Sequence, residues 1–175
     1  MKIRLLVCAL VMFSCGKNEV QEQTRPAAQG EAQIQEMISS LYNGFARAYN
    51  EGGINTDSLI DVYYDKGIHY VTSWGWTEPI DTTKARLRNA TAHVKDYSAH
   101  IEGLQVKTYG DGAYAFFILR QSTNVDGTLL EEYLPTTLVL ERRGTGWKIV
   151  HAHRSTDYET FEQYIAMQKN KSGSR

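Results

Sequence analysis

The chain has 175 residues, of which 42% are hydrophobic and 22% are charged, and its formal net charge is −1. This balance is typical of a folded soluble domain and excludes a disordered or fibrous chain. Because the 19 basic residues are outnumbered by 20 acidic ones, the chain lacks the positive excess of nucleic-acid-binding proteins, and we expect no nucleic-acid partner.

The first fifteen residues predict a bacterial lipoprotein signal. Lys2 and Arg4 precede an uninterrupted apolar stretch, 5–13, which is too short to span a bilayer as a mature helix. Ser14 before Cys15 resembles a lipobox, in which the cysteine is lipidated and becomes the new N-terminus. We therefore expect a signal peptide in 1–14, lipidation of Cys15 and a membrane-anchored location in the bacterial cell envelope, periplasmic or surface-facing. Plain secretion is the alternative.

Residues 15–30 predict a flexible tether, because they are polar, rich in glutamine and interrupted by Pro26 and Gly30. The folded domain is then expected to cover 31–158. Its first element is an amphipathic helix from 31 to 51, in which apolar residues recur at steps of three and four. Two consecutive glycines end this helix.

A short second helix is expected at about 57–63, with Thr56 or Asp57 as its N-cap. The segment 68–76 is β-branched and aromatic, which predicts a strand broken near Gly75. Asp81 is expected to cap a third helix, whose apolar positions at helical spacing are Leu87, Ala90 and Val94.

The rest of the chain is rich in predicted strands. The alternation in 97–106 changes at Gly103, which predicts a bulge. Asp111-Gly112 and Asp126-Gly127 indicate tight turns between long strands. Three helices followed by an antiparallel meander predict an α+β fold, with the helices packed on one side of a curved sheet. A capping-box pattern then favours a short helix and a polar tail in 159–175.

The last two predicted strands carry a recognisable pattern. Val139–Arg143, a glycine turn and Trp147–Ser155 resemble the end of the association (hub) domain of calcium/calmodulin-dependent protein kinase II. They are also similar to bacterial SnoaL-like proteins of the nuclear-transport-factor-2-like (NTF2-like) superfamily. The likeness is weaker upstream and covers about 31–155. It implies an NTF2-like cone, in which about three N-terminal helices pack on a strongly curved, mostly antiparallel sheet with a pocket at its wide end.

The resemblance also implies that arginines in this pocket hold a small carboxylate. Arg154 matches one of them, and Arg120 matches a second if one residue of slippage is allowed. Tyr70, Trp74 and Trp76 are expected to form an aromatic wall or rim, with ordinary core packing as the alternative. These five residues suit a small, acidic organic ligand with an aromatic or amphipathic body.

Other chemistries have weaker support. His151 and His153 alternate along one strand and could share a metal ion, but the sequence shows no third ligand, so we predict neither a metal nor a cofactor. The simpler interpretation places both histidines on the face of Trp147 and Ile149, packed against a neighbouring element or a second subunit. A cofactor-free isomerase, dehydratase or cyclase using acid–base chemistry is the main alternative to a binding protein; its candidate residues are Asp61, Asp65, His69, Tyr70, Tyr133 and His153.

The segment 113–119 is apolar on both faces of its strand. One face can fill the cone, whereas the other would be exposed unless a second subunit covered it. We therefore expect a homodimer. This feature also keeps a third hypothesis open, an oligomerisation module whose pocket is vestigial.

Overall fold

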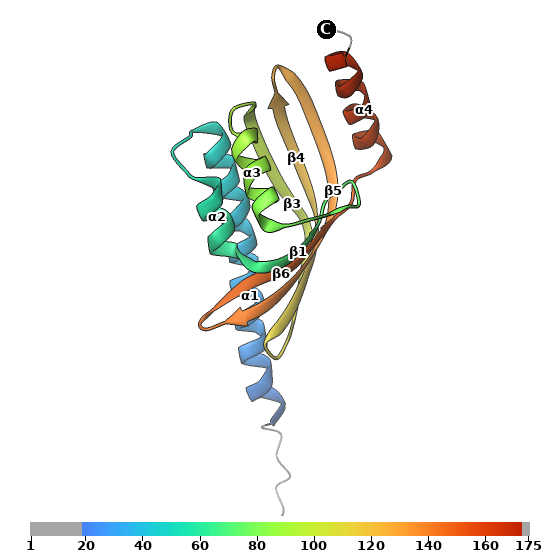
Figure 1. Cartoon of the computed structure of the whole chain (residues 1–175). Helices are drawn as coiled ribbons and strands as arrows, with labels where there is room; N and C mark the ends of the chain where they lie inside the picture. Colours follow the sequence, from blue (N-terminus) through green and yellow to red (C-terminus); the bar gives the residue numbers. More distant parts are fainter. Residues whose placement is uncertain (1–18, 173–175) are drawn as a thin grey trace, which may run out of the picture.

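The computed structural model describes residues 19–172, so the signal segment 1–14 and Cys15 lie outside the described residues. In that range four helices pack with one six-stranded sheet (Figure 1). The elements are α1 Glu19–Asn50, α2 Thr56–Tyr63, β1 Tyr64–Val71, β2 Thr77–Glu78, α3 Ile80–Ala90, β3 Val94–Tyr109, β4 Gly112–Val125, β5 Thr128–Arg143, β6 Gly146–Arg154 and α4 Tyr158–Ser172. The predicted α+β fold is confirmed.

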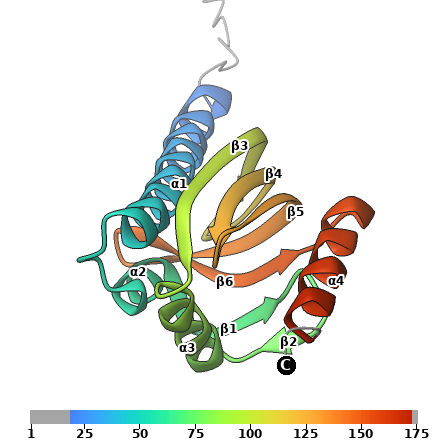
Figure 2. The same cartoon turned by 90° about the horizontal axis from the view of Figure 1, so that it is seen from above.

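The sheet has the strand order β2-β1-β6-β5-β4-β3. All neighbouring strands are antiparallel except β1 and β6, which run parallel. The sheet is strongly bent but does not close, and α1 lies along its concave face with α2 and α3 beside one end (Figure 2). The main hydrophobic core fills the space between α1 and this face.

The buried face of α1 explains its position. Ile34, Ile38 and Leu41 are fully buried, and each such side chain contributes about 1.5–3 kcal/mol to the hydrophobic stabilisation of the fold. The helix begins at Glu19 rather than at residue 31, so the expected tether is wrong from Glu19 onwards. Gly30 is buried in the helix, and a Cβ at this position would meet Thr108 at 3.3 Å. The glycine thus allows close packing on β3, and the helix continues through it.

The short elements also differ from the sequence predictions in detail. The N-cap of α2 is Asn55, whose side chain accepts a hydrogen bond from the backbone N–H of Asp57 at 2.8 Å. Pro79, rather than Asp81, precedes α3, and no side chain caps this helix. The predicted strand 68–76 is replaced by β1, which starts earlier because Tyr64 pairs with Ile149 of β6, and by a turn.

Two irregularities expected in the long strands are confirmed. The register of β3 and β4 shifts between Glu102 and Gln105, and Gly103 has a φ of 63°, a left-handed value that glycine adopts without strain. Asp126 and Gly127 have φ values of 51° and 87°, as a tight hairpin turn of the type I′ class requires. These features let β3, β4 and β5 curve around α1.

The C-terminal helix α4 covers part of an open strand edge. β6 pairs with β5 only from Thr136 onwards, so the preceding residues of β5 lack a β6 partner. There Thr160 Oγ1 accepts a hydrogen bond from the backbone N–H of Tyr133, and Gln163 Oε1 accepts one from Glu131, both at 3.2 Å. Pairing these donors satisfies backbone groups that would otherwise need water. None of the helices within 19–172 is both long and apolar enough to cross a bilayer.

The two faces of β4 differ as its pattern predicted. Phe117 and Leu119 are fully buried against the concave core, whereas Tyr114 and Phe116 on the outer face are 37% and 38% exposed. Val139 of β5 is also 38% exposed and extends this outer apolar surface. Such a surface favours association with a second copy, which stays a prediction.

We expect the protein to sediment as a dimer at micromolar concentration and the variant Phe116→Asp to sediment as a monomer, because a charge would have to be buried in the contact. Leu129→Asp is the matched control, since Leu129 is 64% exposed but lies at the start of β5, away from this surface. A wild-type protein that sediments only as a monomer would contradict the prediction.

Candidate functional site

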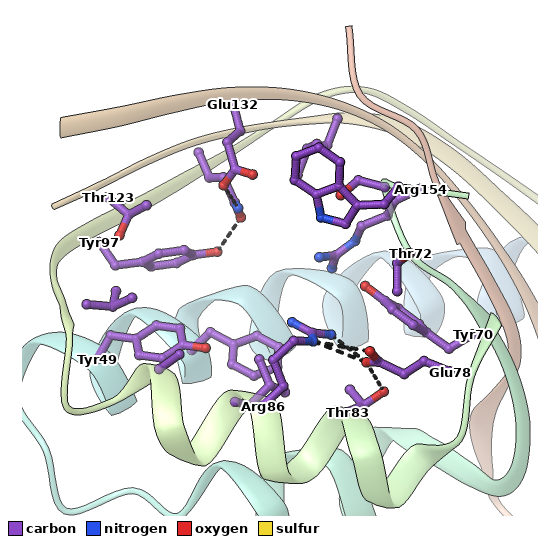
Figure 3. A pocket seen from close by; sticks show the side chains of 18 of the residues that line it. Tyr49, Tyr70, Thr72, Glu78, Thr83, Arg86, Tyr97, Thr123, Glu132 and Arg154 are labelled. Carbon is purple, nitrogen blue, oxygen red and sulfur yellow. Dashed lines mark hydrogen bonds and ion pairs between the residues drawn. The ribbon is translucent and has the colours of Figure 1, made fainter. Parts of the chain in front are cut away.

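A cavity of about 330 Å³ lies between the helices and the concave face of the sheet (Figure 3). It is lined by side chains from α1, α2, α3, α4 and all six strands, so no short segment of sequence contains it. Aromatic and apolar groups make up most of the wall, and polar groups gather at three places. Its lining includes Tyr42, Tyr49, Tyr64, Tyr70, Trp74, Trp76, Glu78, Thr83, Arg86, Tyr97, Gln121, Thr123, Glu132, Arg154 and Tyr164.

Arg154 forms the first polar place. It is the last residue of β6, and its Nη2 donates a hydrogen bond to the Tyr42 hydroxyl at 2.8 Å. Its Nε is buried without a hydrogen-bond partner. Within residues 27–166, no carboxylate oxygen lies within 4.0 Å of the Arg154 guanidinium, the distance that defines an ion pair. Arginine stays charged even in such surroundings. Burial lowers the pKa of Arg154, but the tyrosines around it, Tyr42 first, raise that pKa well above its ordinary value.

A β-bulge brings Arg154 into the cavity. Leu140 of β5 pairs with Ile149, but Val139 pairs with His151, so Val150 is an extra residue in β6. Side chains before and after the bulge therefore alternate out of phase. Trp147 and Ile149 are buried before it, and Ala152 is buried after it.

The same bulge turns His151 and His153 to the outer face. His153 is exposed and His151 is half-buried. The expectation that both histidines share the face of Trp147 and Ile149 is therefore wrong, because strict alternation fails at Val150.

Tyrosine hydroxyls surround the guanidinium of Arg154. Burial raises the pKa of Tyr42 and Tyr64, and it raises the pKa of Tyr49 to about 12. Tyr70 is only 6% exposed, and its hydroxyl points into the cavity (Figure 3). At neutral pH the three phenols with raised pKa are protonated, so they offer neutral hydrogen-bond donors and acceptors beside a fixed positive charge.

The second polar place is an ion pair between α3 and β2. Arg86 Nη2 and Nε lie 2.7 and 3.2 Å from Glu78 Oε1, which also accepts a hydrogen bond from the Thr83 hydroxyl at 2.6 Å. Burial raises the pKa of Glu78, but the Arg86 guanidinium and the Thr83 hydroxyl outweigh it and hold that pKa below its ordinary 4.5. Arg86 is thus compensated by a carboxylate, whereas Arg154 is not.

The third polar place lies across the cavity. Glu132 of β5 accepts hydrogen bonds from Gln121 Nε2 and from the Tyr164 hydroxyl of α4. The Tyr97 hydroxyl donates to Gln121 Oε1 at 3.1 Å. This carboxylate, which is 7% exposed, therefore already has donors from the protein. Thr123 is also buried in the wall, and its hydroxyl has no hydrogen-bond partner.

The predicted aromatic residues lie at this cavity. Trp74 and Trp76, in and beside the turn between β1 and β2, stack with ring centres 6.3 Å apart, and Trp76 is 58% exposed. Trp74 also meets the Tyr164 ring edge-on at 4.2 Å, which joins the turn to α4. Four of the five predicted ligand-binding residues thus line one cavity, namely Tyr70, Trp74, Trp76 and Arg154. Their binding of a ligand stays a prediction.

Arg120 does not join them. It lies on the outer face of β4, where its Nε is 2.7 Å from Glu102 and its guanidinium stacks over Tyr133 at 4.8 Å. The expectation of a second pocket arginine at this position is therefore wrong: the strand alternates strictly here, so Gln121, and not Arg120, faces the cavity.

Most candidates for acid–base chemistry lie elsewhere. None of the five histidines is among the cavity-lining residues. Asp61 is exposed and pairs with Lys84 at 2.5 Å, and Asp65 accepts a hydrogen bond from the Gly67 backbone as a turn residue does. Tyr133 is on the outer face with Arg120. Tyr70 alone of the six candidates lines the cavity.

The sequence analysis missed several polar residues of the cavity. Arg86 and Glu78 come from α3 and β2, and Glu132 comes from an inward position of β5 between Leu130 and Leu134. A signal for Glu132 existed, because a carboxylate at an inward position of a strand with apolar alternation is costly unless it has partners. Arg86 gave no comparable signal, since one arginine on a polar helix is ordinary.

The geometry has counterparts in known proteins. The SnoaL-like domain family profile matches residues 38–159. No curated protein sequence shows a significant match.

Several solved structures have the same fold. A proposed dehydratase of the NTF2-like family from Streptomyces avermitilis is 14% identical, with a TM-score of 0.63 over 74% of this chain and 97% of its own. An NTF2-like protein with a cystatin-like fold from Novosphingobium aromaticivorans is 15% identical, with a TM-score of 0.60 over 82% and 91%. A proposed calcium/calmodulin-dependent kinase II association domain from Exiguobacterium sibiricum is 9% identical, with a TM-score of 0.60 over 72% and 92%. At these identities the likeness concerns the fold alone.

The ion pair of Glu78 yields a prediction on stability. Glu78→Gln should lower the free energy of unfolding at pH 7 by about 1–2 kcal/mol, between the values typical of exposed and buried pairs. Because the folded-state pKa of Glu78 is below 4.5, its contribution is complete above pH 4.5 and is lost as the pH falls through the folded-state value. Denaturant unfolding at several pH values should therefore show the two proteins converging in acid.

A double-mutant cycle with Arg86→Gln isolates the pair. If Glu78→Gln costs as much in the presence of Arg86→Gln as in its absence, the two residues are not coupled and the interpretation fails.

Proposed function

This chain belongs to the SnoaL-like domain family, and we propose that it is a lipid-anchored protein of the bacterial cell envelope that binds a small organic carboxylate in its cavity. The observation that carries the proposal is the uncompensated charge of Arg154. A buried cation without a carboxylate partner is costly, and an anionic ligand would supply that partner. Guanidinium and carboxylate groups also match geometrically, since they can form two parallel hydrogen bonds.

The walls of the cavity support a ligand with an apolar or aromatic body. Trp74 and Tyr70 offer flat ring surfaces, while Leu134 and Phe45 close other parts of the wall. A volume of about 330 Å³ is at the lower end of the roughly 300–1,000 Å³ typical of ligand sites, so the ligand should be small. The open volume also favours binding over an assembly module with a vestigial pocket.

The arrangement favours binding over catalysis. A cofactor-free isomerase, dehydratase or cyclase would need a base and an acid facing the reacting atoms. Among the lining residues the carboxylates of Glu78 and Glu132 already have partners, and no histidine is present. Tyr70 is the lining candidate that the sequence indicated for proton transfer. We therefore place ligand binding first and leave turnover as the alternative.

The arginine anchor predicts a loss of affinity in one variant. Aromatic carboxylates such as benzoate and phenylacetate should raise the melting temperature of the protein, whereas the corresponding amides should raise it less, because they lack the charge that Arg154 would pair. Charge-assisted hydrogen bonds contribute about 1.5–3 kcal/mol, so Arg154→Gln should weaken carboxylate binding by roughly 10-fold to 100-fold in calorimetric titrations.

Arg120→Gln is the matched control, because it removes the same charge from the outer face. It should leave carboxylate affinity unchanged. Equal affinities in wild type and Arg154→Gln, with both proteins folded, would refute the anchor.

The lipid anchor is tested separately from the binding site. Expression in a bacterial host with a palmitate analogue should label the wild-type protein, and Cys15→Ala should abolish the labelling, because the cysteine carries the acyl chains in our proposal. Washed membranes should retain the wild type and release the variant, since multiple acyl chains give a stable anchor. Equal labelling of both proteins would rule the assignment out.

A further inference from the structure

We propose that the outer face of the sheet carries a binding site for a divalent transition-metal ion such as Zn²⁺, held by His69, His151 and His153. The site is separate from the cavity, which lies on the other side of the sheet. The sequence places two of these histidines two residues apart in one strand. The third lies more than eighty residues earlier, and the fold brings it to them.

The parallel pairing of β1 and β6 carries the argument. The two strands lie side by side in the sheet (Figure 2). In their register His69 lies directly beside His151, and Val71 lies beside His153. Paired residues of neighbouring strands point to the same side, and Tyr70 and Ala152, the next pair along, are both buried on the concave side. His69 and His151 therefore share the outer face, and His153, two residues further along β6, shares it too.

The spacing of these three positions suits a common ion. Neighbouring strands are about 4.8 Å apart, and alternate residues of one strand are about 6.6 Å apart. Three imidazoles at the corners of such a triangle can reach one metal at the usual nitrogen distance of about 2.0–2.1 Å. Three histidine ligands and one open position are a coordination set that zinc accepts in proteins.

The side chains need to turn to reach this arrangement. Within the described residues no three histidine, cysteine or carboxylate side chains already surround a common point. His69 and His153 are exposed, and exposed side chains change rotamer within nanoseconds, so the backbone register and not the present rotamers limits the site. In the described part of the chain none of the three has a side-chain partner, whereas His93 is paired with Asp126 at 2.9 Å.

The surroundings fit an imidazole site. On the neighbouring strand β5, Thr137 pairs with His153, and Val139 pairs with His151. The threonine hydroxyl can accept a hydrogen bond from the imidazole nitrogen that does not bind the metal, a role that a carboxylate, a backbone carbonyl or water usually has at such sites. Imidazole donors favour Zn²⁺, Cu²⁺ and Ni²⁺ over Mg²⁺ and Ca²⁺, which prefer oxygen.

Metal titration of the purified full-length protein tests the site. We expect one Zn²⁺ per protomer in calorimetric titrations, and we expect Co²⁺ in its place to give the visible absorption of a four-coordinate ion. His69→Gln and His153→Gln should each weaken Zn²⁺ binding by at least ~10-fold, because two imidazoles hold the ion less tightly than three. Unchanged melting temperatures without metal would show that the variants are folded.

His100→Gln is the matched control. His100 is exposed, and it lies on the outer face because its register partner Arg120 does. His100 is in β3, however, three strands away from β6. Its substitution should leave Zn²⁺ affinity unchanged. His69→Gln is decisive, because a chelate of His151 and His153 alone would survive it. Wild-type affinity in His69→Gln, or one ion bound between two copies instead of one per protomer, would overturn the proposal.

Discussion

The extra residue Val150 in β6 decides what the last strand contributes to each side of the sheet. Before this bulge the inward residues are odd-numbered, and after it they are even-numbered. Arg154 consequently joins the concave side of the sheet, where it lines the cavity and its Nε is buried, and His151 and His153 join the outer side. Without the bulge, strict alternation would place the arginine outside and both histidines in the cavity.

The partners of Arg154 in the cavity are neutral. Tyr42 is its hydrogen-bond partner, and other phenols surround it, so neutral groups and not carboxylates solvate the guanidinium. The two carboxylates of the cavity are bound elsewhere, Glu78 by Arg86 and Glu132 by Gln121 and Tyr164. Among the described residues that line the cavity, both acids are thus paired and Arg154 has no carboxylate partner, an asymmetry that supports the anionic ligand we propose.

Local patterns predicted the fold well where one element determines its own shape. The period of apolar residues located α1, the change of alternation located the bulge at Gly103, and the Asp126-Gly127 pair located a turn; both glycines have positive φ in the structure. The two apolar faces of β4 were also evident from its alternation. The predicted start of α1 was wrong because a glycine such as Gly30 usually disfavours a helix. Here the glycine lies inside α1, where its lack of a side chain allows close packing on Thr108.

The candidate site was predictable only in part. The sequence indicated four of its residues, which lie in aromatic or recognisable stretches: Tyr70, Trp74, Trp76 and Arg154. Arg120 was expected in the cavity, but its neighbour Gln121 is there instead, because adjacent residues of a strand face opposite sides of the sheet. The ion pair of Arg86 and Glu78 was not predicted, since no pattern in the sequence indicates that this residue of α3 contacts the short strand β2.

The sequence by itself determined the fold class, the main helix, the turns and the chemical character of each strand. Those properties depend on residues close together in the chain: the spacing of apolar residues indicates a helix or a strand, and Asp-Gly pairs indicate a turn. Only the tertiary structure decided which side chains meet, because the parallel pairing of β1 with β6 joins segments about eighty residues apart. That pairing sets Tyr70, which lines the cavity, beside the buried Ala152, and it sets His69 beside His151 on the opposite face. Local spacing carries no information about either neighbour.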